Sequence, residues 1–471
     1  EARALLLVCE GRTFIAGADI REFGKPMQEP TLPTLVNTFE SSDKPLVAAI
    51  HGTALGGGLE TALSCHYRVA ISSAKVGLPE VKLGLLPGAG GTQRLPRLTG
   101  ARKALEMITT GEFVGAKDAL ALGILDAVEE GDDIRAVGMA YAQKVVDEGK
   151  PVRRVRDITD KIEADKGSDV FDQFRDELKK RARGLFSPFK CVDAVEAAFN
   201  LPFGEGMKRE RELFMECMES PQRAGLIHSF FGEREVSKVK GLPKDTPVRD
   251  VKSVGIIGAG TMGGGIAMNF VNVGIPVTIV EVKQEALDKG LAIIRRNYEN
   301  SAKKGKLTQE QVEQRMALIT PSLTYDDFRD VDLVIEAVFE NMAIKKEIFA
   351  KLDEVCKPGA ILASNTSTLD IDEIASATKR PEDVVGMHFF SPANVMKLLE
   401  NVRGSKTSDE VKATVMAVAK KIKKVGVMVG NCYGFVGNRM LHKRGTEAMS
   451  LVDEGATPQQ VDKVLTDLGF P

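Results

Sequence analysis

A short apolar strand that runs directly into closely spaced glycines constrains the second half of this chain most strongly. Val254-Gly-Ile-Ile257 leads into Gly258-Ala-Gly260-Thr-Met-Gly263. Apolar residues then recur at helical intervals, at Met262, Ile266, Phe270 and Val273. A second strand pattern, Gly274 to Val280, ends in Glu281. This order predicts a dinucleotide-binding fold, because the glycines let backbone N–H groups and the helix N-terminus approach a pyrophosphate. The alternative is a tight strand-to-helix turn in an unrelated α/β protein.

The acid that closes this pattern favours one dinucleotide over the other. Glu281 is expected to accept hydrogen bonds from the adenosine ribose hydroxyls and to repel a 2′-phosphate, which favours NAD over NADP, although Lys283 nearby is basic. The expected cofactor-binding residues of the turn are Gly258, Gly260, Thr261, Met262 and Gly263.

Further strand patterns in this half end in polar residues. Val331 to Ile335 is followed by Glu336, and Ala360 to Ala363 runs into Ser364-Asn-Thr-Ser367. Asp383 to Met387 runs into His388. Because the carboxyl ends of parallel strands face the ligand crevice, we expect Ser367 and His388 to lie where the chemistry occurs.

His388 is one of five histidines, and Glu400 follows it by twelve residues. Oxidising an alcohol requires a base for the hydroxyl proton, and an imidazole oriented by a carboxylate suits that task near neutral pH. A structural role is the usual alternative for a lone histidine. We assign that role to His51, His66, His228 and His442, which have no comparable setting.

The first half contains two small-residue turns and two isolated glutamates. Phe14 to Asp19 and Gly56 to Gly58 each place backbone N–H groups where a carbonyl oxygen could approach, which predicts an oxyanion hole. Glu60 lies in the first turn of the following helix, and Glu80 precedes the glycine-rich run Pro87 to Gly91. Together the two carboxylates could hold a water. Taken singly, Glu60 could be a first-turn acid favoured by the helix dipole and Glu80 a solvated loop residue.

Length and composition indicate a multidomain globular protein. The chain has 471 residues, and 64 basic against 66 acidic side chains argue against a nucleic-acid binder. No apolar run approaches the roughly 18 residues of a transmembrane helix. The six cysteines are widely spaced, so we expect buried thiols in a reducing compartment and no metal site.

The glycine pattern divides the chain. Glycine thins between about residues 140 and 250, where Leu213, Phe214, Cys217, Met218, Leu226, Ile227, Phe230 and Phe231 recur as on helices that bury one face. Residues 238–250 are polar, contain two prolines and are predicted to be a linker. The predicted domains are 1–160, a helical connector and linker at 161–250, 251–430, and the beginning of a further domain at 431–471. The chain begins at Glu1 in a strand pattern and stops at Pro471 after a turn, so we expect both ends to be cut.

Five motifs in the second half resemble the L-3-hydroxyacyl-CoA dehydrogenases. They are the glycine turn, Glu336-Ala-Val-Phe-Glu340-Asn, Ser364-Asn-Thr-Ser367, His388-Phe-Phe-Ser-Pro with Glu400, and Asn431-Cys-Tyr-Gly-Phe-Val-Gly-Asn438-Arg. The resemblance implies that His388 is the base, that Glu400 orients it, and that Ser367 and Asn438 lie around the substrate oxygens. It also implies that Glu340, Lys345 and Ser367 lie on the nicotinamide-ribose side of NAD.

Four motifs in the first half resemble the enoyl-CoA hydratases of the crotonase family. They are Ala16-Gly-Ala-Asp19, Leu55-Gly-Gly-Gly-Leu-Glu60, Gly77-Leu-Pro-Glu80 and Pro87-Gly-Ala-Gly-Gly-Thr-Gln-Arg94. The resemblance implies that the N–H groups of Ala18 and Gly57 bind the thioester oxygen. It further implies that Glu80 protonates C2 and that Glu60 helps to hold and activate the water.

Together the two halves resemble the multifunctional fatty-acid β-oxidation enzymes, of the peroxisomal type 1 or the bacterial α-subunit kind. The implied fold is α/β: a crotonase ββα superhelix, a helical linker, a doubly wound Rossmann domain and the start of an all-α dehydrogenase domain. The implied reactions are hydration of 2-trans-enoyl-CoA and NAD-dependent oxidation of the L-3-hydroxyacyl-CoA. Double-bond isomerisation at the first site, or a binding module without turnover, are the alternatives.

The resemblance also bears on partners and compartment. It implies acyl-CoA thioester substrates and a thiolase as a candidate partner, and leaves the oligomeric state open. The expected location is the bacterial cytoplasm, with the peroxisome as the alternative.

Overall fold

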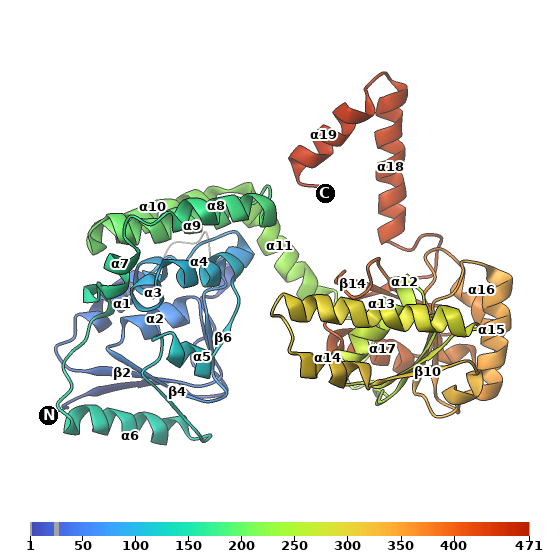
Figure 1. The fold of residues 1–471 in the computed structure, drawn as a ribbon, viewed down its shortest axis with the longest axis horizontal. Coiled ribbons are helices and arrows are strands. Elements are labelled where there is room, and N and C mark those ends of the chain that lie inside the picture. Colours follow the sequence, from blue (N-terminus) through green and yellow to red (C-terminus); the bar gives the residue numbers. More distant parts are fainter. Residues whose placement is uncertain (1, 23–27, 471) are drawn as a thin grey trace. The chain divides into compact units, whose positions relative to one another are not determined.

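The computed structural model describes residues 2–22 and 28–470 and divides the chain into two compact units (Figure 1). The first unit runs to Phe231 and also takes in the stretch from Lys463 onward, and the second is Gly232–Asp462. The two units are described separately below.

The first unit is built on two small sheets. From Leu5 to Glu235 the elements are β1 (Leu5–Val8), η1 (Ile20–Glu22), α1 (Leu32–Glu40), β2 (Leu46–Ile50), β3 (Thr53–Leu55), α2 (Gly57–Ser64), β4 (Tyr67–Ile71), β5 (Lys75–Gly77), η2 (Glu80–Leu83), α3 (Gly91–Thr99), α4 (Ala101–Thr110), β6 (Val114–Gly115), α5 (Ala116–Ala121), β7 (Ala127–Glu129), α6 (Ile134–Asp147), η3 (Val155–Asp157), α7 (Asp160–Asp165), α8 (Val170–Arg181), α9 (Ser187–Asn200), α10 (Phe203–Glu219) and α11 (Pro221–Glu235). The larger sheet has the order β1-β2-β4-β7 and is parallel throughout, and the smaller has the order β3-β5-β6.

Both faces of the larger sheet are covered. Ala48 and Ile50 of β2 point into the main core, whereas Val47 and Ala49 pack with Tyr141 and neighbouring residues of α6. Figure 1 shows α6 on one side of β2 and β4 and the other helices on the opposite side. Every residue of β2 and β4 is buried for this reason, and β2 is a continuous apolar run rather than an alternating one.

The helices of the predicted connector share the core of the first unit. Ile162, Phe174, Cys191 and Leu213, from α7 to α10, lie in the same buried cluster as the sheet residues. The expectation of a helix that buries one face is confirmed for α10. It is wrong for α11, in which no residue is fully buried. The apolar residues of α11 do recur on one face of the helix. The described residues of the unit bury that face only in part.

The second unit contains an eight-stranded sheet. Its elements and those that follow are β8 (Val254–Ile257), α12 (Thr261–Val271), β9 (Val277–Val280), α13 (Gln284–Lys303), α14 (Gln309–Met316), β10 (Ile319–Ser322), η4 (Tyr325–Phe328), β11 (Leu333–Glu336), α15 (Met342–Val355), β12 (Ile361–Ser364), α16 (Ile371–Ala375), η5 (Pro381–Asp383), β13 (Val384–Phe389), β14 (Leu398–Arg403), α17 (Asp409–Lys421), β15 (Val425–Gly430), α18 (Gly437–Asp453) and α19 (Pro458–Leu468). The strand order is β10-β9-β8-β11-β12-β13-β14-β15, and only the β13–β14 pair is antiparallel. The order reverses at β8, as in a doubly wound sheet.

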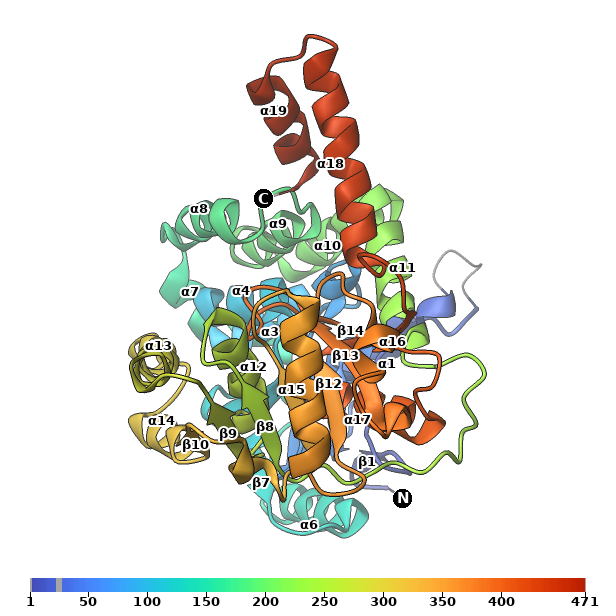
Figure 2. The same cartoon turned by 90° about the vertical axis from the view of Figure 1, so that its right-hand side faces the viewer.

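Helices cover both faces of this sheet (Figure 2). Residues of α12, α13 and α17 share one buried cluster with strand residues, and residues of α15 and α16 share another. The strands expected at Val254 to Ile257 and at Ala360 to Ala363 are present within one residue. The strand expected from Gly274 starts at Val277, because Gly274 adopts a left-handed turn conformation with φ of 79°.

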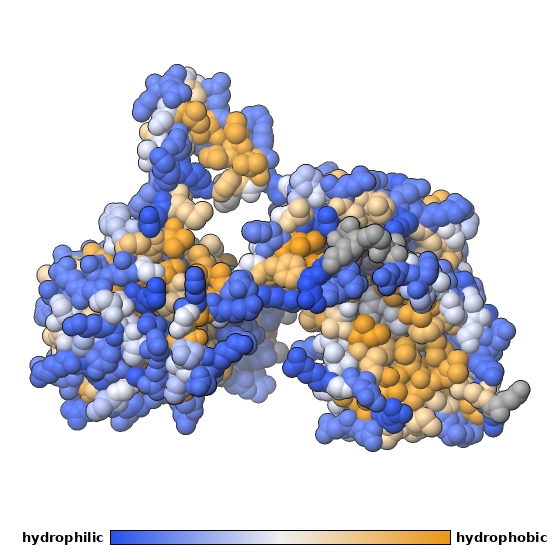
Figure 3. Space-filling view, turned by 180° about the vertical axis from the view of Figure 1, so that it is seen from behind, coloured by the Kyte–Doolittle hydropathy of each residue, from blue (hydrophilic) through white to orange (hydrophobic). Residues whose placement is uncertain are grey.

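The last two helices are largely exposed. No residue of α18 or α19 is buried, and apolar side chains such as Met440, Met449 and Leu468 are exposed. Figure 3 shows hydrophobic surface on this pair of helices. In the part of the chain that the structure describes, no helix is both long and apolar enough to cross a membrane.

The six cysteines are free thiols, but not all are buried. Cys65, Cys191, Cys217 and Cys356 are buried as expected, whereas Cys9 is half-buried and Cys432 is exposed. The expectation of uniformly buried thiols is therefore wrong for two of them.

The packing of α8 predicts that the connector is needed for the stability of the first unit. Phe174→Ala removes a fully buried ring and should lower the free energy of unfolding of that unit by about 3–5 kcal/mol. Hydrogen exchange followed by mass spectrometry should show faster exchange in peptides from residues 28–231 and no change in peptides from 254–430. Leu185→Ala, at a 44% exposed side chain, is the control. Unchanged exchange in the first unit would contradict a shared core.

Candidate functional sites

In the first unit two glycine turns and a glutamate come together. The amide of Leu55 donates to the carbonyl of Ile15 at 3.0 Å, which places the two turns side by side. A Cβ on Gly56 would lie 3.0 Å from Glu80 Oε1 and 3.9 Å from Gly17 Cα. Gly56 has a φ of 54°, so the turn favours glycine for its backbone conformation as well as for space. The predicted oxyanion-hole residues Ala18 and Gly57 are the next residues along each turn.

Helix α2 begins at this point with uncapped amides. Its N-cap, Gly56, makes no side-chain hydrogen bond to the first turn. A Cβ on Gly58 would lie only 2.2 Å from the carbonyl oxygen of Ile15, so the helix can approach the neighbouring turn this closely only with glycine there. The first-turn amides, including that of Gly57, can therefore donate to a ligand oxygen.

Glu60 lies in the first turn of α2 as expected and is 2% exposed. Its Oε1 accepts hydrogen bonds from the amides of Ala89 and Gly91, at 2.7 and 2.8 Å. Burial raises its pKa, and the two amides and the charge of Arg94 oppose that rise. The carboxylate is thus bound by the glycine-rich loop before α3 rather than by its own helix alone.

Glu80 begins η2, and its side chain is directed to the same place. Its Oε2 is buried and has no hydrogen-bond partner among the described residues. Burial raises its pKa well above the usual value, and the negative charge of Glu60 raises it further. The alternative of a solvated loop residue is therefore wrong. A raised pKa favours the protonated form of a carboxyl, which is the form that can serve as an acid.

A third buried glutamate, Glu210, was not found by the sequence reasoning. It lies on α10, and its Oε1 accepts from the amide of Gly90 at 2.7 Å. Its Oε2 accepts from the amide and the hydroxyl of Thr92, at 3.1 and 2.5 Å. The available signal was its register, because α10 buries Gly206, Glu210, Leu213 and Cys217 at intervals of four, three and four. A charged residue within an apolar stripe requires a partner.

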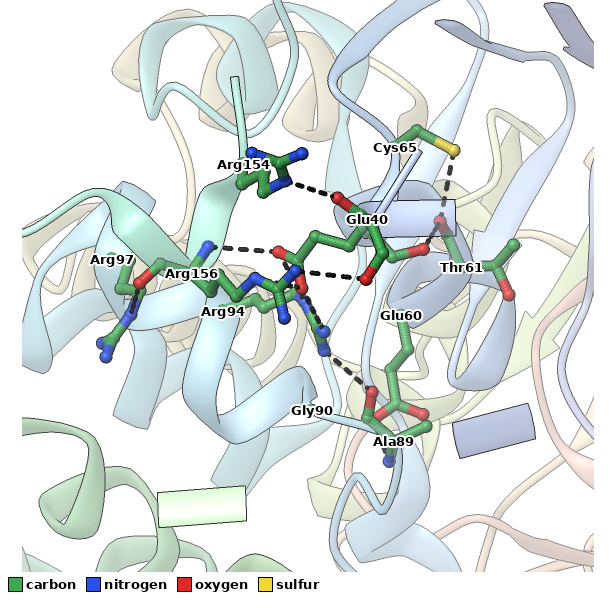
Figure 4. A network of polar contacts seen from close by, with 12 residues as sticks. Glu40, Glu60, Thr61, Cys65, Ala89, Gly90, Arg94, Arg97, Arg154 and Arg156 are labelled. Atoms are coloured by element: carbon green, nitrogen blue, oxygen red, sulfur yellow. Dashed lines mark hydrogen bonds and ion pairs between the residues drawn. The ribbon is translucent and has the colours of Figure 1, made fainter. Parts of the chain in front are cut away.

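An arginine holds the same loop from another side (Figure 4). Arg94 donates to the carbonyl of Ala89 at 3.1 Å and to the buried carboxylate of Glu40 at 2.7 Å. Glu40 also accepts from the amide of Arg156 at 3.1 Å, and its carbonyl accepts from Arg154 at 2.9 Å. The peptide of Ala89 therefore connects this ion-pair network to Glu60.

In the second unit the glycine turn has the space that a dinucleotide needs. A Cβ on Gly258 would lie 2.8 Å from the carbonyl of Ala337, and one on Gly263 would lie 1.9 Å from the carbonyl of Gly258. A Cβ on Gly260 would meet nothing within 4 Å. Gly258 and Gly263 thus permit close packing of the turn, whereas Gly260 faces open space. The amides of α12, which starts at Thr261 and continues with Met262, have no side-chain cap. These features fit a pyrophosphate at the helix N-terminus.

Glu281 follows β9 directly and faces this turn. Its Oε2 accepts from the amide of Ala259 at 3.1 Å, and its Oε1 accepts from the amide of Val282 at 2.8 Å. The position is the one expected for an acid that binds the adenosine ribose.

His388 and Glu400 are direct cross-strand neighbours in the antiparallel pair β13–β14. Nδ1 of His388 lies 2.8 Å from Oε2 of Glu400, and both side chains are buried. The other oxygen of Glu400 accepts from the amides of Val436 and Gly437, at 3.1 and 2.8 Å. Burial alone would raise the pKa of Glu400, but His388 and these two amides hold it below its usual value. The histidine is thereby oriented by an anionic partner.

Ser367 and Asn438 lie beside each other in this unit. The side-chain amide of Asn438 donates to the carbonyl of Ser367 at 3.3 Å. Glu340 holds the same loop, since its Oε1 accepts from the hydroxyl of Thr366 and the amide of Ser367 at 2.6 and 2.8 Å. Burial would raise the pKa of Glu340, but these donors, together with the charge of Lys345, lower it.

Lys345 is fully buried and pairs with Glu336, a residue to which the sequence reasoning gave no role. Its Nζ lies 2.7 and 2.8 Å from the two carboxylate oxygens of Glu336 and 3.7 Å from Glu340. Ser364 also donates to Glu336 at 2.7 Å. Because Lys345 lies on α15, Glu336 on β11 and Ser364 on β12, these contacts hold the three elements together.

His51 and His66 have structural surroundings. His66 is buried, and its Nδ1 accepts from the amide of Leu46 at 3.0 Å, while His51 contacts the carbonyl of Gly11. Among the described residues no group of three or more His, Cys, Asp or Glu side chains is placed to hold a metal ion.

Comparison with known proteins gives three family matches. Residues 1–181 match the enoyl-CoA hydratase/isomerase family, residues 253–432 the NAD-binding domain of 3-hydroxyacyl-CoA dehydrogenase, and residues 434–471 the C-terminal domain of that enzyme. The dinucleotide predicted from the glycine turn is thus NAD.

Individual relatives span both regions. The peroxisomal bifunctional enzyme of Danio rerio is 48% identical over 99% of this chain and 64% of its own length. The peroxisomal fatty acid beta-oxidation multifunctional protein AIM1 of Arabidopsis thaliana is 39% identical over 100% of this chain and 67% of its own length. A solved (S)-3-hydroxybutyryl-CoA dehydrogenase from Ralstonia eutropha is 40% identical and covers 46% of this chain and 77% of its own, with a TM-score of 0.45.

The chain therefore combines a region that matches the enoyl-CoA hydratase/isomerase family with a region that matches the NAD-binding domain of 3-hydroxyacyl-CoA dehydrogenase. The chain belongs to the family of multifunctional fatty-acid β-oxidation proteins. It spans about 64–65% of the length of the first curated relatives that it matches.

The contrast between two glycines gives a prediction for the second unit. Gly260→Ala places a methyl group in open space, so the variant should keep its Tm, but the methyl should obstruct the pyrophosphate and raise the Kd for NADH about tenfold or more. Gly263→Ala forces a contact of 1.9 Å with the carbonyl of Gly258 and should lower the Tm of the unit. Fluorescence titration with NADH and thermal unfolding measure the two effects. Equal NADH binding by Gly260→Ala and the parent would exclude this turn as the pyrophosphate site.

Proposed function

We propose that this chain hydrates 2-trans-enoyl-CoA to L-3-hydroxyacyl-CoA in its first unit and oxidises that product to 3-ketoacyl-CoA with NAD in its second. The observation that carries the proposal is the presence of two groups of side chains whose reactive atoms are largely buried. Glu60 and Glu80 lie beside two glycine turns, and His388 and Glu400 lie on paired strands. The product of the first reaction is the substrate of the second, which is a physical reason for joining them in one chain.

In the hydration step the first unit would act on the thioester carbonyl. Its oxygen accepts hydrogen bonds from the amides of Ala18 and Gly57, which stabilise the negative charge of the enolate. Glu60 accepts a proton from water as the water oxygen bonds to C3, and Glu80 gives its proton to C2. One water is added in total, as hydroxyl at C3 and hydrogen at C2. The raised pKa of Glu80 supports its role as the acid.

In the oxidation step the second unit would act on the C3 hydroxyl. Ser367 and Asn438 position the hydroxyl oxygen, and His388 accepts its proton at Nε2. Glu400, bonded to Nδ1, stabilises the imidazolium that results. The hydride that leaves C3 goes to the nicotinamide ring, which is the chemistry that NAD supplies when bound. The turn Gly258 to Gly263 and Glu281 would hold the rest of the dinucleotide, with Glu340 and Lys345 on the nicotinamide-ribose side.

The two alternatives from the sequence are less well supported. Double-bond isomerisation needs only one carboxylate at the enolate, so the second buried glutamate, Glu60, favours hydration. A binding module without turnover has no need of Glu60, Glu80, His388 and Glu400 as a complete set.

The partners and the compartment follow from the same proposal. The substrates are acyl-CoA thioesters, and a thiolase is the class of enzyme that would consume a 3-ketoacyl-CoA. The names of the relatives favour the peroxisome over the bacterial cytoplasm that the sequence reasoning placed first.

The hydratase assignment predicts the behaviour of one variant. Glu80→Gln cannot give a proton to C2, so the loss of enoyl-thioester absorbance with crotonyl-CoA should fall by about 100-fold or more. NADH formation from 3-hydroxybutyryl-CoA by the same variant should stay at the parent rate, which controls for protein quality. Unchanged hydration would remove Glu80 from the mechanism. Trans-3-enoyl-CoA as the sole substrate measures the isomerase alternative.

The dehydrogenase assignment predicts the reciprocal result. His388→Gln removes the base and should lower NADH formation from 3-hydroxybutyryl-CoA by about 100-fold or more, while the Kd for NADH stays within about twofold. Crotonyl-CoA hydration should be unaffected. Oxidation at the parent rate would show that His388 is a structural histidine.

A further inference from the structure

Four consecutive amides at the start of α3 alternate between two buried carboxylates. The amides of Ala89 and Gly91 donate to Oε1 of Glu60, at 2.7 and 2.8 Å. Those of Gly90 and Thr92 donate to Glu210, at 2.7 and 3.1 Å. Each carboxylate thus takes every second amide, so neither can move without disturbing the backbone that binds the other.

The loop has little freedom to respond to a change at either carboxylate. Glu60 and Glu210 are 2% and 1% exposed. A Cβ on Gly90 would lie 1.9 Å from Nη1 of Arg94, and one on Gly91 would lie 3.0 Å from Oε1 of Glu60. The N-cap Gly90 has no side chain to satisfy the first turn of α3, so the two glutamates do so.

The nearby negative charges disfavour ionisation of Glu60 and Glu210 at the same time. The charges of Glu60 and Glu210 act on Glu80, the charge of Glu60 acts on Glu210, and the charge of Arg94 acts on Glu60 and Glu210. Arg94 also pairs with the buried carboxylate of Glu40. Burial raises the pKa of Glu210 to about 8, and the charge of Glu60 adds to this rise. The raised pKa favours the protonated form of Glu210 more than an exposed carboxyl would, so its ionisation falls within the pH range of an assay.

We propose that Glu210 is a positioning residue for hydration. From α10 it holds the amides of Gly90 and Thr92, and so directs the amides of Ala89 and Gly91 to Glu60, the group that accepts the proton of water. The inference rests on the proposed function of the first unit. It assigns to the connector a direct part in arranging the hydratase site, in which Glu210 acts through the amides that it binds.

A purely structural cap would give different kinetics from a positioning residue. Loss of a cap lowers the Tm and reduces the amount of folded enzyme, but leaves the KM and the shape of the pH profile of the folded fraction unchanged. Loss of a positioning residue lowers kcat with little change in KM, and it removes the ionisation of Glu210 from the profile.

The test uses Glu210→Gln in the full chain, assayed with crotonyl-CoA between pH 6 and pH 9.5. We expect kcat for hydration to fall about 10- to 100-fold, with KM within about twofold. The reason is that the side chain of Gln has a single oxygen, so one of the backbone amides bound by Glu210 would meet an NH₂ donor instead of an acceptor. The parent kcat profile should contain a step near pH 8 that Glu210→Gln lacks. Glu212→Gln, at an exposed position on the same helix, is the matched control and should behave as the parent.

A second variant keeps the test decisive if Glu210→Gln does not fold. Thr92→Val removes the hydroxyl that donates to Glu210 at 2.5 Å and retains the amide. Since that bond favours the anion, its loss should move the step near pH 8 to higher pH and lower kcat several-fold. A step that stays in place overturns the inference, as does a Glu210→Gln enzyme with parental kcat and profile.

These outcomes are distinct from failure of the proposed function. If the parent chain does not hydrate crotonyl-CoA, or if Glu80→Gln is as active as the parent, the hydratase assignment itself is wrong. If the parent hydrates and depends on Glu80 but is indifferent to Glu210, only the role of Glu210 is wrong.

Discussion

Hydrogen bonds from backbone amides to buried carboxylates are the interaction on which both sites depend. Glu60 and Glu210 are held by the loop before α3, Glu400 by the first amides of α18, and Glu340 by the loop after β12. A carboxylate removed from water must be compensated, and amides at turns and helix N-termini supply the compensation without a mobile partner. Each side chain thereby has one position, which proton transfer at a defined atom requires.

The glycines serve the same purpose by letting backbone approach backbone. At Gly58, Gly258 and Gly263 a Cβ would overlap a main-chain carbonyl, so the close contacts between turn and helix exist only with glycine. The first unit uses these contacts to bring two turns to Glu80, and the second uses them to open the N-terminus of α12. The same local device thus supports an enolate site in one unit and a dinucleotide site in the other.

Much of the second unit could be predicted, because its information is local. The strands that end in Glu336, Ser364 and His388 are apolar runs with a polar end, and the parallel sheet carries those ends to one edge. The pairing of His388 with Glu400 follows from twelve residues of chain that turn back as an antiparallel strand. The roles of these residues in catalysis stay predictions that the proposed variants test.

By itself the sequence determined the two glycine turns, the order of strands and helices around them, and the residue types at the strand ends, since these depend on neighbours within about twenty positions. Only the tertiary structure decided that helices after residue 160 share the first core, that Oε2 of Glu80 is buried, and that Glu210 binds a loop 120 residues earlier. The ion pair between Lys345 and Glu336 likewise depends on the packing of α15 on the sheet. The physical reason is that burial and charge pairing are set by contacts between distant segments, which no local pattern specifies.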